Sequence, residues 1–132
     1  MLAIDENLPA GQRFLLRSWG IRFRTVGVDV ASFGTDDENL IPILHRLPQP
    51  TFFSLDRDFY RPDRAHTGYA LVWLDIAADE AAEFIRRFLK HPLFETQGKR
   101  MGVVARVHAD GVVQWRTKHR YSQSLSWPGR QD

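Results

Sequence analysis

The sequence of 132 residues contains no cysteine. This absence excludes disulfide bonds, thiolate zinc sites and cysteine nucleophiles together, so a metal site would have to use oxygen or imidazole ligands. Long apolar runs are absent as well. No stretch approaches the ~18 residues of a membrane-spanning helix, and the apolar start at residues 1–4 is followed directly by Asp5 and Glu6. We therefore expect a cytoplasmic protein with neither a membrane span nor a secretory signal, and no membrane partner.

The composition is that of an ordinary globular protein. Hydrophobic residues make up 43% and charged residues 26% of the chain, which excludes a disordered, collagen-like or coiled-coil protein. A chain of this length forms one domain with its own core. We expect that domain to span residues 1–117, and the polar residues 118–132, which include proline and glycine, to form a C-terminal tail.

Charge is distributed unevenly along the chain. Residues 1–83 carry 13 acidic and 8 basic side chains, a net charge of −5, whereas residues 84–132 carry 3 acidic and 10 basic side chains, a net charge of +7. Such asymmetry indicates that the second half binds a nucleic acid or another polyanion. Fifteen of the 18 cations are arginine, which suits bidentate contacts to phosphate. The alternative is an exposed helix end and hairpin that are basic without binding anything.

Strand and helix patterns alternate along most of the chain. Apolar or alternating segments predict strands at residues 2–4, 21–26, 51–55 and 69–76, and apolar stripes at helical spacing predict helices between residues 7 and 20, 35 and 47, and 79 and 90. Asp110-Gly111 lies between two further strand patterns, residues 101–107 and 112–117, and predicts a hairpin. The expected fold class is therefore α/β, with a mostly parallel sheet and a C-terminal β-hairpin.

Proline complicates the second helix. Pro42 lies deep in the pattern that begins at residue 35, where it removes a backbone hydrogen bond and clashes with the preceding turn. Either this helix begins late, near Asn39, or it is kinked. Both alternatives affect how the acidic residues at its start are oriented.

Acidic residues follow the strands that we expect to be buried. Asp5 and Glu6 end the first strand, Asp56 and Asp58 follow the third, and Asp36 and Asp37 open the second helix. In open α/β sheets the functional crevice lies beyond the carboxyl ends of the strands, so these carboxylates are expected to gather there. Clustered carboxylates require a cation, and Mg²⁺ or Mn²⁺ bound by acids and phosphate oxygens predicts phosphodiester chemistry. The alternative for each acid is a helix cap or a solvated loop residue.

These motifs resemble a known family. The opening Ile4-Asp5-Glu6-Asn7-Leu8-Pro9, the acid-led helix at residues 35–38 and the segment Phe53-Ser54-Leu55-Asp56-Arg57-Asp58-Phe59 look like the PIN-like nuclease domains. The nearest likeness is to the small single-domain group related to the VapC-type toxins of toxin–antitoxin systems, and it covers residues 1–76. The resemblance implies a three-layer α/β/α sandwich and a divalent-metal endoribonuclease restrained by a partner protein.

The resemblance also implies which residues form the site. Asp5, Asp37 and Asp56 match the metal-binding acids, with Asp36 as the alternative to Asp37, and Asp58 completes the catalytic set. Glu6 and Ser54 are supporting candidates, Ser54 standing where the family usually has threonine. The implied cofactor is Mg²⁺ or Mn²⁺. The implied partners are RNA and an antitoxin-like protein, and a second copy of the chain, as a homodimer, is a further candidate.

Arginines supply the candidate phosphate contacts. Arg57 and Arg61 flank the acidic motif, although they could instead pair with Asp58 or Asp63. In the basic second half the candidates are Arg86, Arg87, Lys99, Arg100, Arg106, Arg116 and Arg120. Two other functions stay open: a non-catalytic binding module with the same fold, and a nuclease that acts on DNA.

Overall fold

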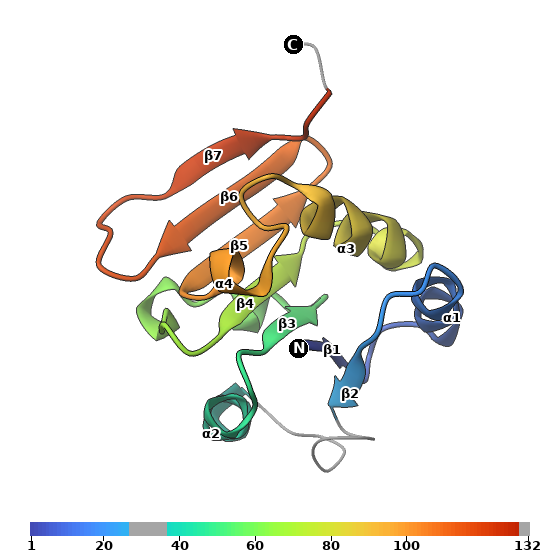
Figure 1. Ribbon diagram of the computed structural model, residues 1–132, viewed down its shortest axis with the longest axis horizontal. Helices are drawn as coiled ribbons and strands as arrows, with labels where there is room; N and C mark the ends of the chain where they lie inside the picture. The colour runs from blue at the N-terminus through green and yellow to red at the C-terminus, as the bar shows by residue number, and fades with distance from the viewer. Residues whose placement is uncertain (27–36, 130–132) are drawn as a thin grey trace.

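A single seven-stranded sheet organises the chain. The computed structural model describes residues 1–26 and 37–129, and the side chains of all of these except residues 37–39. The strand order is β2-β1-β3-β4-β5-β6-β7, in which β2, β1, β3, β4 and β5 are parallel and β6 and β7 are antiparallel (Figure 1). The elements run in chain order β1 (Leu2–Asp5), α1 (Ala10–Ser18), β2 (Arg24–Val26), α2 (Asp37–Arg46), β3 (Thr51–Ser54), η1 (Arg57–Phe59), η2 (Pro62–Arg64), β4 (Ala70–Leu74), η3 (Ala78–Glu80), α3 (Ala81–Lys90), α4 (Gln97–Arg100), β5 (Val103–His108), β6 (Gly111–Arg116) and β7 (Gln123–Ser126).

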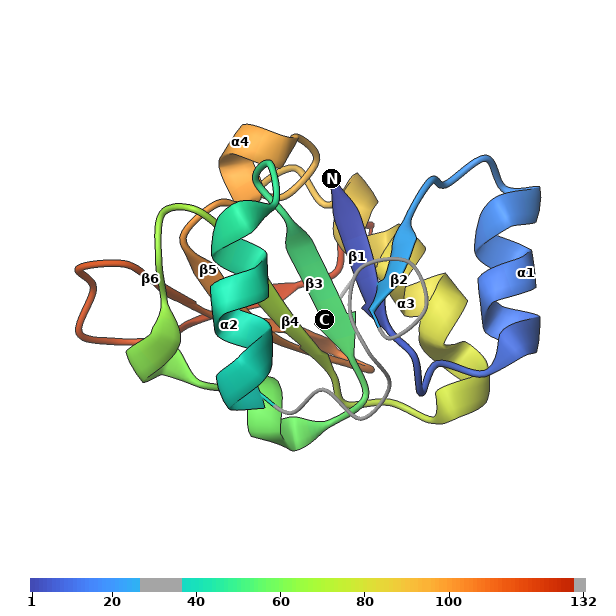
Figure 2. The ribbon, with the colours of Figure 1, turned by 90° about the horizontal axis from the view of Figure 1, so that it is seen from below.

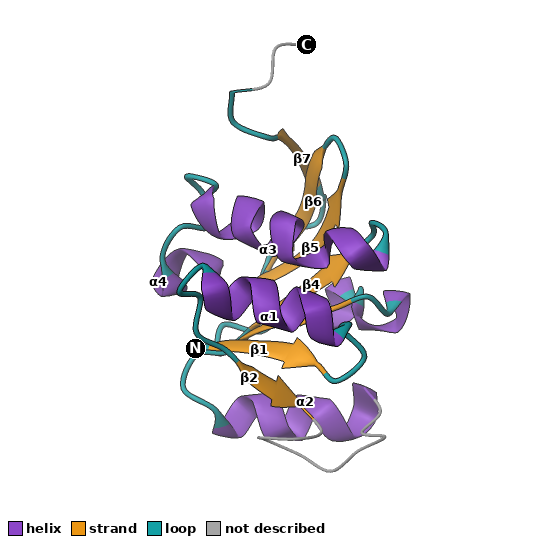
Figure 3. Cartoon of the chain, turned by 90° about the vertical axis from the view of Figure 1, so that its right-hand side faces the viewer, coloured by secondary structure: helices purple, strands orange, loops and turns teal. Residues whose placement is uncertain are grey.

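Helices cover both faces of this sheet. Helices α1 and α3 lie side by side on one face, and α2 lies on the other (Figures 2 and 3). Successive strand residues point to opposite faces, so in β3 Phe53 packs with Leu16 and Phe88 beneath α1 and α3, whereas Phe52 packs with Leu40 and other α2 residues. The predicted α/β class with a mostly parallel sheet is confirmed. In the described part of the chain, no helix has the length and apolar character needed to cross a membrane.

The predicted hairpin is confirmed as well. Strands β5 and β6 pair antiparallel with His108 opposite Gly111, so Ala109 and Asp110 form a two-residue connection. The predicted strand at residues 21–26 is present as the shorter β2 and lies at the edge of the sheet, as its alternation of apolar and basic residues indicated.

Helix α2 contains its proline. It begins at Asp37 rather than near Asn39, and Pro42 lies within it, so the late start considered above is wrong. An interior proline costs about 3 kcal/mol. Leu40 and Leu44 are fully buried against the sheet, and each such burial contributes about 1.5–3 kcal/mol, which offsets that cost.

The predicted C-terminal tail is wrong in extent. Residues 123–126 form β7, which pairs with β6, and the Gln114 side-chain amide donates to Gln123 Oε1 at 2.9 Å. Trp127 is only 5% exposed, and its indole nitrogen donates to the carbonyl oxygen of His108 at 3.0 Å. The folded unit therefore extends at least to Trp127. Backbone pairing with an existing strand and burial of one indole hold a segment whose own composition is polar.

The chain reverses its direction of winding at β1. From β1 it passes through α1 on one face to β2, and α2 lies on the opposite face before β3, which pairs with the other side of β1. In open α/β sheets, ligands bind beyond the carboxyl ends of the strands at such a switch point. The topology therefore points to the carboxyl ends of β1 and β3.

Candidate active site

Asp5 is held at the carboxyl end of β1. It is the last residue of that strand and is 9% exposed. The hydroxyl of Ser54, the last residue of β3, donates to Asp5 Oδ2 at 2.7 Å, and the backbone N–H of Asn7 donates to Oδ1 at 3.2 Å. Both carboxylate oxygens therefore have a donor, and the side chain is fixed in one orientation.

Ser54 joins the two acidic motifs. Its Oγ also accepts from the backbone N–H of Asp56 at 2.9 Å, and Asp56 Oδ1 accepts from the backbone N–H of Asp58 at 2.9 Å, capping η1. A continuous chain of hydrogen bonds therefore runs from Asp5 through Ser54 to Asp56 and Asp58. Asp5 and the segment 56–58 lie together at one edge of the sheet, as the sequence predicted.

Within the described part of the chain, no cation balances the charge of these acids at close range. Among the described side chains, no lysine or arginine lies within salt-bridge distance of Asp5, Asp56 or Asp58. A nearly buried carboxylate that lacks a cationic partner is costly, and hydrogen bonds from a hydroxyl and an amide compensate only in part. Carboxylate oxygens are the ligands that Mg²⁺ and Mn²⁺ prefer. Asp5, Asp56 and Asp58 therefore offer oxygen atoms of the kind that such a cation binds.

The structure describes the other predicted acids only in part. Helix α2 runs back from the carboxyl edge toward the start of β3, so its first residue, Asp37, lies near the edge where Asp5 lies. The side chain of Asp37 and the whole of Asp36 lie outside the described residues. Glu6 follows Asp5 and is partly buried. Within the described residues, no three histidine or acidic side chains come together as a group that could hold a metal ion.

Arg57 and Arg61 behave differently from one another. Arg57 is exposed, and its guanidinium lies 5.9 Å from the ring centre of Trp73. Arg61 donates to both carboxylate oxygens of Asp63, at 3.1 and 3.0 Å, and this hydrogen bonding holds the pKa of Asp63 below its ordinary value. The alternative that Arg61 pairs with Asp63 is therefore confirmed, and Arg57 is the arginine available beside the acids.

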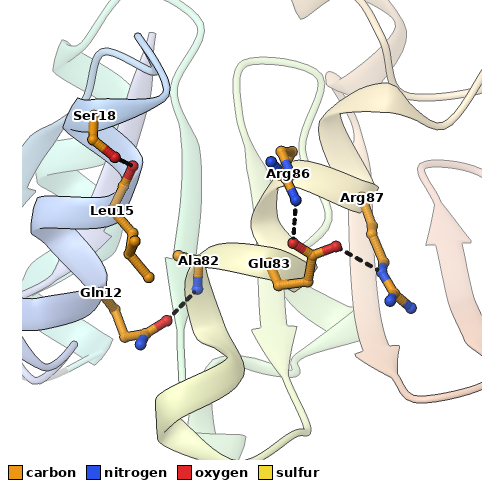
Figure 4. Close-up of polar contacts among 7 residues, drawn as sticks. All are labelled: Gln12, Leu15, Ser18, Ala82, Glu83, Arg86 and Arg87. Carbon is orange, nitrogen blue, oxygen red and sulfur yellow. Dashed lines mark hydrogen bonds and ion pairs between the residues drawn. The ribbon is translucent and has the colours of Figure 1, made fainter.

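Arg86 and Arg87 share one acid on α3. Both donate to the carboxylate of Glu83 (Figure 4). Burial acts to raise the pKa of Glu83, but the hydrogen bonds from Arg87 and Arg86 outweigh it and hold this pKa below its ordinary value. Figure 4 also shows how α1 meets α3: Gln12 Oε1 accepts from the backbone N–H of Ala82 at 2.9 Å. The two arginines are thus held on α3 by Glu83 and are partly neutralised.

Arg100 is a structural residue, and its prediction as a phosphate contact is wrong. It is 7% exposed, and its guanidinium donates to Thr51 Oγ1 and to the carbonyl oxygen of Phe94, both at 2.9 Å. Burial lowers its pKa. Thr51 begins β3, so Arg100 also lies at the edge of the sheet opposite to the acids.

The remaining cations of the second half are spread over several elements. Arg106 on β5 pairs with Asp75, and Lys99 on α4 pairs with Glu95. Arg116 donates to the backbone of Lys99 rather than to an acid. A charge balance over long halves of the chain hides a shorter segment, residues 10–26, which has four arginines and no acid.

In comparisons with known proteins, no family model matches this chain, and searches of curated proteins and of solved structures find no significant match. The site itself therefore carries the functional argument. Its defining features are a buried carboxylate at the switch point, a serine that bridges two acidic motifs, and acids that lack a cation among the described residues.

Proposed function

We propose that this protein is a divalent-metal-dependent endoribonuclease with a PIN-like three-layer fold, which hydrolyses RNA phosphodiester bonds. The observation that carries the proposal is the hydrogen-bonded chain from Asp5 through Ser54 to Asp56 at the carboxyl ends of β1 and β3. It supports the proposal because the switch point of an open α/β sheet is where ligands bind.

Each acid has a distinct role in the proposed reaction. Asp5 and Asp56, together with Asp37, would hold Mg²⁺ or Mn²⁺, and Ser54 holds the carboxylate of Asp5 in one orientation. When bound, the ion supplies charge stabilisation for the transition state and lowers the pKa of water. Asp58 would orient the attacking water, and Arg57 would contact a phosphate next to the bond that is cut.

Cleavage of a labelled single-stranded RNA tests the proposal. With Mn²⁺ or Mg²⁺ the wild type should cut the RNA internally, chelation should stop it, and Asp5→Asn or Asp56→Asn should abolish it. The matched control is Asp63→Asn, which removes an exposed acid that pairs with Arg61 outside the proposed site, and it should keep full activity. Cleavage that persists unchanged in both site variants would come from a contaminating nuclease and would remove this support.

A second candidate function is a non-catalytic binding module with the same fold. The observation that favours it is local: Asp56 caps η1, and both oxygens of Asp5 already accept hydrogen bonds. Acids used in this way need no metal. A binding module would retain RNA with the same affinity in the presence of metal and of chelator, without cleavage. For the nuclease, an antitoxin-like protein remains the proposed partner that restrains the activity.

A further inference from the structure

The segment that runs from α1 through β2, residues 10–26, carries four arginines and no acid. We define the arginine–aromatic surface as six residues of this segment: Phe14, Arg17, Trp19, Arg22, Phe23 and Arg24. Its three arginines are exposed, and none forms an ion pair with another described residue. This contrasts with Arg86 and Arg87 of α3 and Arg106 of β5, which pair with nearby acids. Charge complementarity at this surface therefore favours a polyanion.

Exposed or partly exposed aromatic rings lie in the same segment of the chain as these cations. Phe14 is 68% exposed and Trp19 is 36% exposed, both well above what a buried aromatic shows. The guanidinium of Arg17 lies 4.9 Å from the ring centre of Phe23, and that of Arg86 lies 3.9 Å from the ring centre of Trp19. Proteins that bind single-stranded nucleic acids use aromatic rings and guanidinium planes in this way, since every base can stack on them.

The surface is also hollowed. Arg17, Arg22 and Phe23, together with Gly20 and Ile21, line a depression of about 570 Å³. Arg22 and Phe23 also line a second depression of about 230 Å³ that reaches the start of β1. Each depression is lined by at least one arginine and by Phe23, and a guanidinium beside an aromatic ring can recognise a phosphate and its base together.

The surface lies one helix length from the acidic edge. Helix α1 begins shortly after Asp5 and ends beside Trp19, and its nine residues span about 13 Å. Figure 3 shows α1 and β2 running along the same side of the molecule between these two ends. A single strand bound at the surface can therefore extend along α1 to the carboxyl ends of β1 and β3.

We propose that the arginine–aromatic surface binds single-stranded RNA and presents it to the acidic edge. This inference rests on the proposed function, since it names the surface that holds the substrate of that same site. It assigns affinity to the first half of the chain, which is acidic overall, rather than to the basic second half.

RNA affinity tests the cationic part of this inference. Fluorescence anisotropy of a labelled single strand of about 12 nucleotides is measured with chelator present, so that nothing is cleaved. The variant Arg17→Gln/Arg22→Gln should bind at least about tenfold more weakly, and the slope of log affinity against log salt should fall by about 1.4. The matched control, Lys118→Gln/Arg120→Gln, removes the same charge from the exposed connection between β6 and β7 and should bind within about twofold of wild type.

A second pair of variants tests stacking. Phe14→Ser should weaken binding severalfold with no change in the salt slope, because a ring contributes through stacking rather than charge. Tyr121→Ser removes an aromatic ring that is 82% exposed outside the surface and should leave affinity unchanged. Circular dichroism of all four variants should match wild type, since the replaced side chains are at least partly solvated.

Three outcomes would overturn the inference. Equal weakening by the two charge variants would show that net charge alone drives binding, and unchanged affinity in Arg17→Gln/Arg22→Gln would show that RNA binds elsewhere. If a polyglutamate peptide displaces the labelled RNA at a lower concentration of negative charges than unlabelled RNA needs, the occupant would be an acidic protein. The proposed function can fail separately from this inference. If RNA binds at this surface but is never cleaved, the proposed function is wrong and the inference holds. If Arg17→Gln/Arg22→Gln cleaves RNA with an unchanged KM, the inference is wrong and the proposed function holds.

Discussion

Replacing Ser54 with alanine tests the contact that connects the two acidic motifs. Ser54 is fully buried, and its hydroxyl donates to Asp5 Oδ2 and accepts from the backbone N–H of Asp56. A hydrogen bond to a charged group contributes about 1.5–3 kcal/mol, and a neutral one contributes about 0.5–1.5 kcal/mol. Losing both should lower the free energy of unfolding by about 2–4 kcal/mol. For a chain of this size that corresponds to a fall in Tm of about 7–15 °C.

The assay is urea unfolding of four proteins: wild type, Ser54→Ala, Asp5→Asn and the double variant. If Ser54 acts through Asp5, the two single effects should not add, and the coupling free energy should be about 1–3 kcal/mol. Ser54→Thr retains the hydroxyl and should recover much of the lost stability. The reasoning is refuted if Ser54→Ala unfolds within about 0.5 kcal/mol of wild type, or if its effect is unchanged in the Asp5→Asn background.

Three further predictions concern metal, β7 and pH. Millimolar Mn²⁺ should raise the Tm of wild type, because the ion binds only the folded state. Asp5→Asn or Asp56→Asn should remove this increase in Tm, while the metal-free protein stays folded. Thermal melts with Mn²⁺ and with chelator measure the response of each protein. A β-carbon at Gly111 would lie 1.9 Å from the carbonyl oxygen of Leu125, so Gly111→Ala should displace β7 and destabilise the protein by about 1–3 kcal/mol, seen as faster amide exchange in residues 123–126. Burial lowers the pKa of His91 below its ordinary value of 6.5, so the unfolded chain binds the proton more readily than the folded one. The free energy of unfolding should therefore be highest above pH 6.5 and fall as pH drops through the lowered pKa. Urea unfolding at several pH values checks this, and His91→Gln should flatten the dependence.

Local patterns were sufficient for most elements of the fold. The apolar run that ends at Asp5, the helix that stops near Gly20 and the Asp110-Gly111 hairpin each depend on neighbours in the sequence, through side-chain periodicity and turn chemistry. The same holds for Asp5 and Asp56 at strand ends, because the carboxyl ends of parallel strands always face one edge. Their meeting at that edge was therefore predictable without the order of the strands.

Other features depend on contacts between distant segments. Residues 123–126 are polar and become a strand only because β6 offers an unpaired edge and Trp127 finds a buried position. Arg100 has the composition of a surface residue, yet Thr51 and Phe94 supply enough acceptors to bury it. The local sequence pattern predicts neither the strand nor the buried arginine, because both depend on contacts with residues far away in the sequence.

The sequence by itself determined that acids would end two buried strands, because strand ends and charge are local properties. Only the tertiary structure decided that Ser54 bridges Asp5 and Asp56, and that Arg17, Arg22 and Phe23 line one depression. The physical reason is that a hydrogen bond or a shared surface depends on separations of a few ångströms. Strand order and helix packing set those separations, and residue spacing along the chain does not encode them.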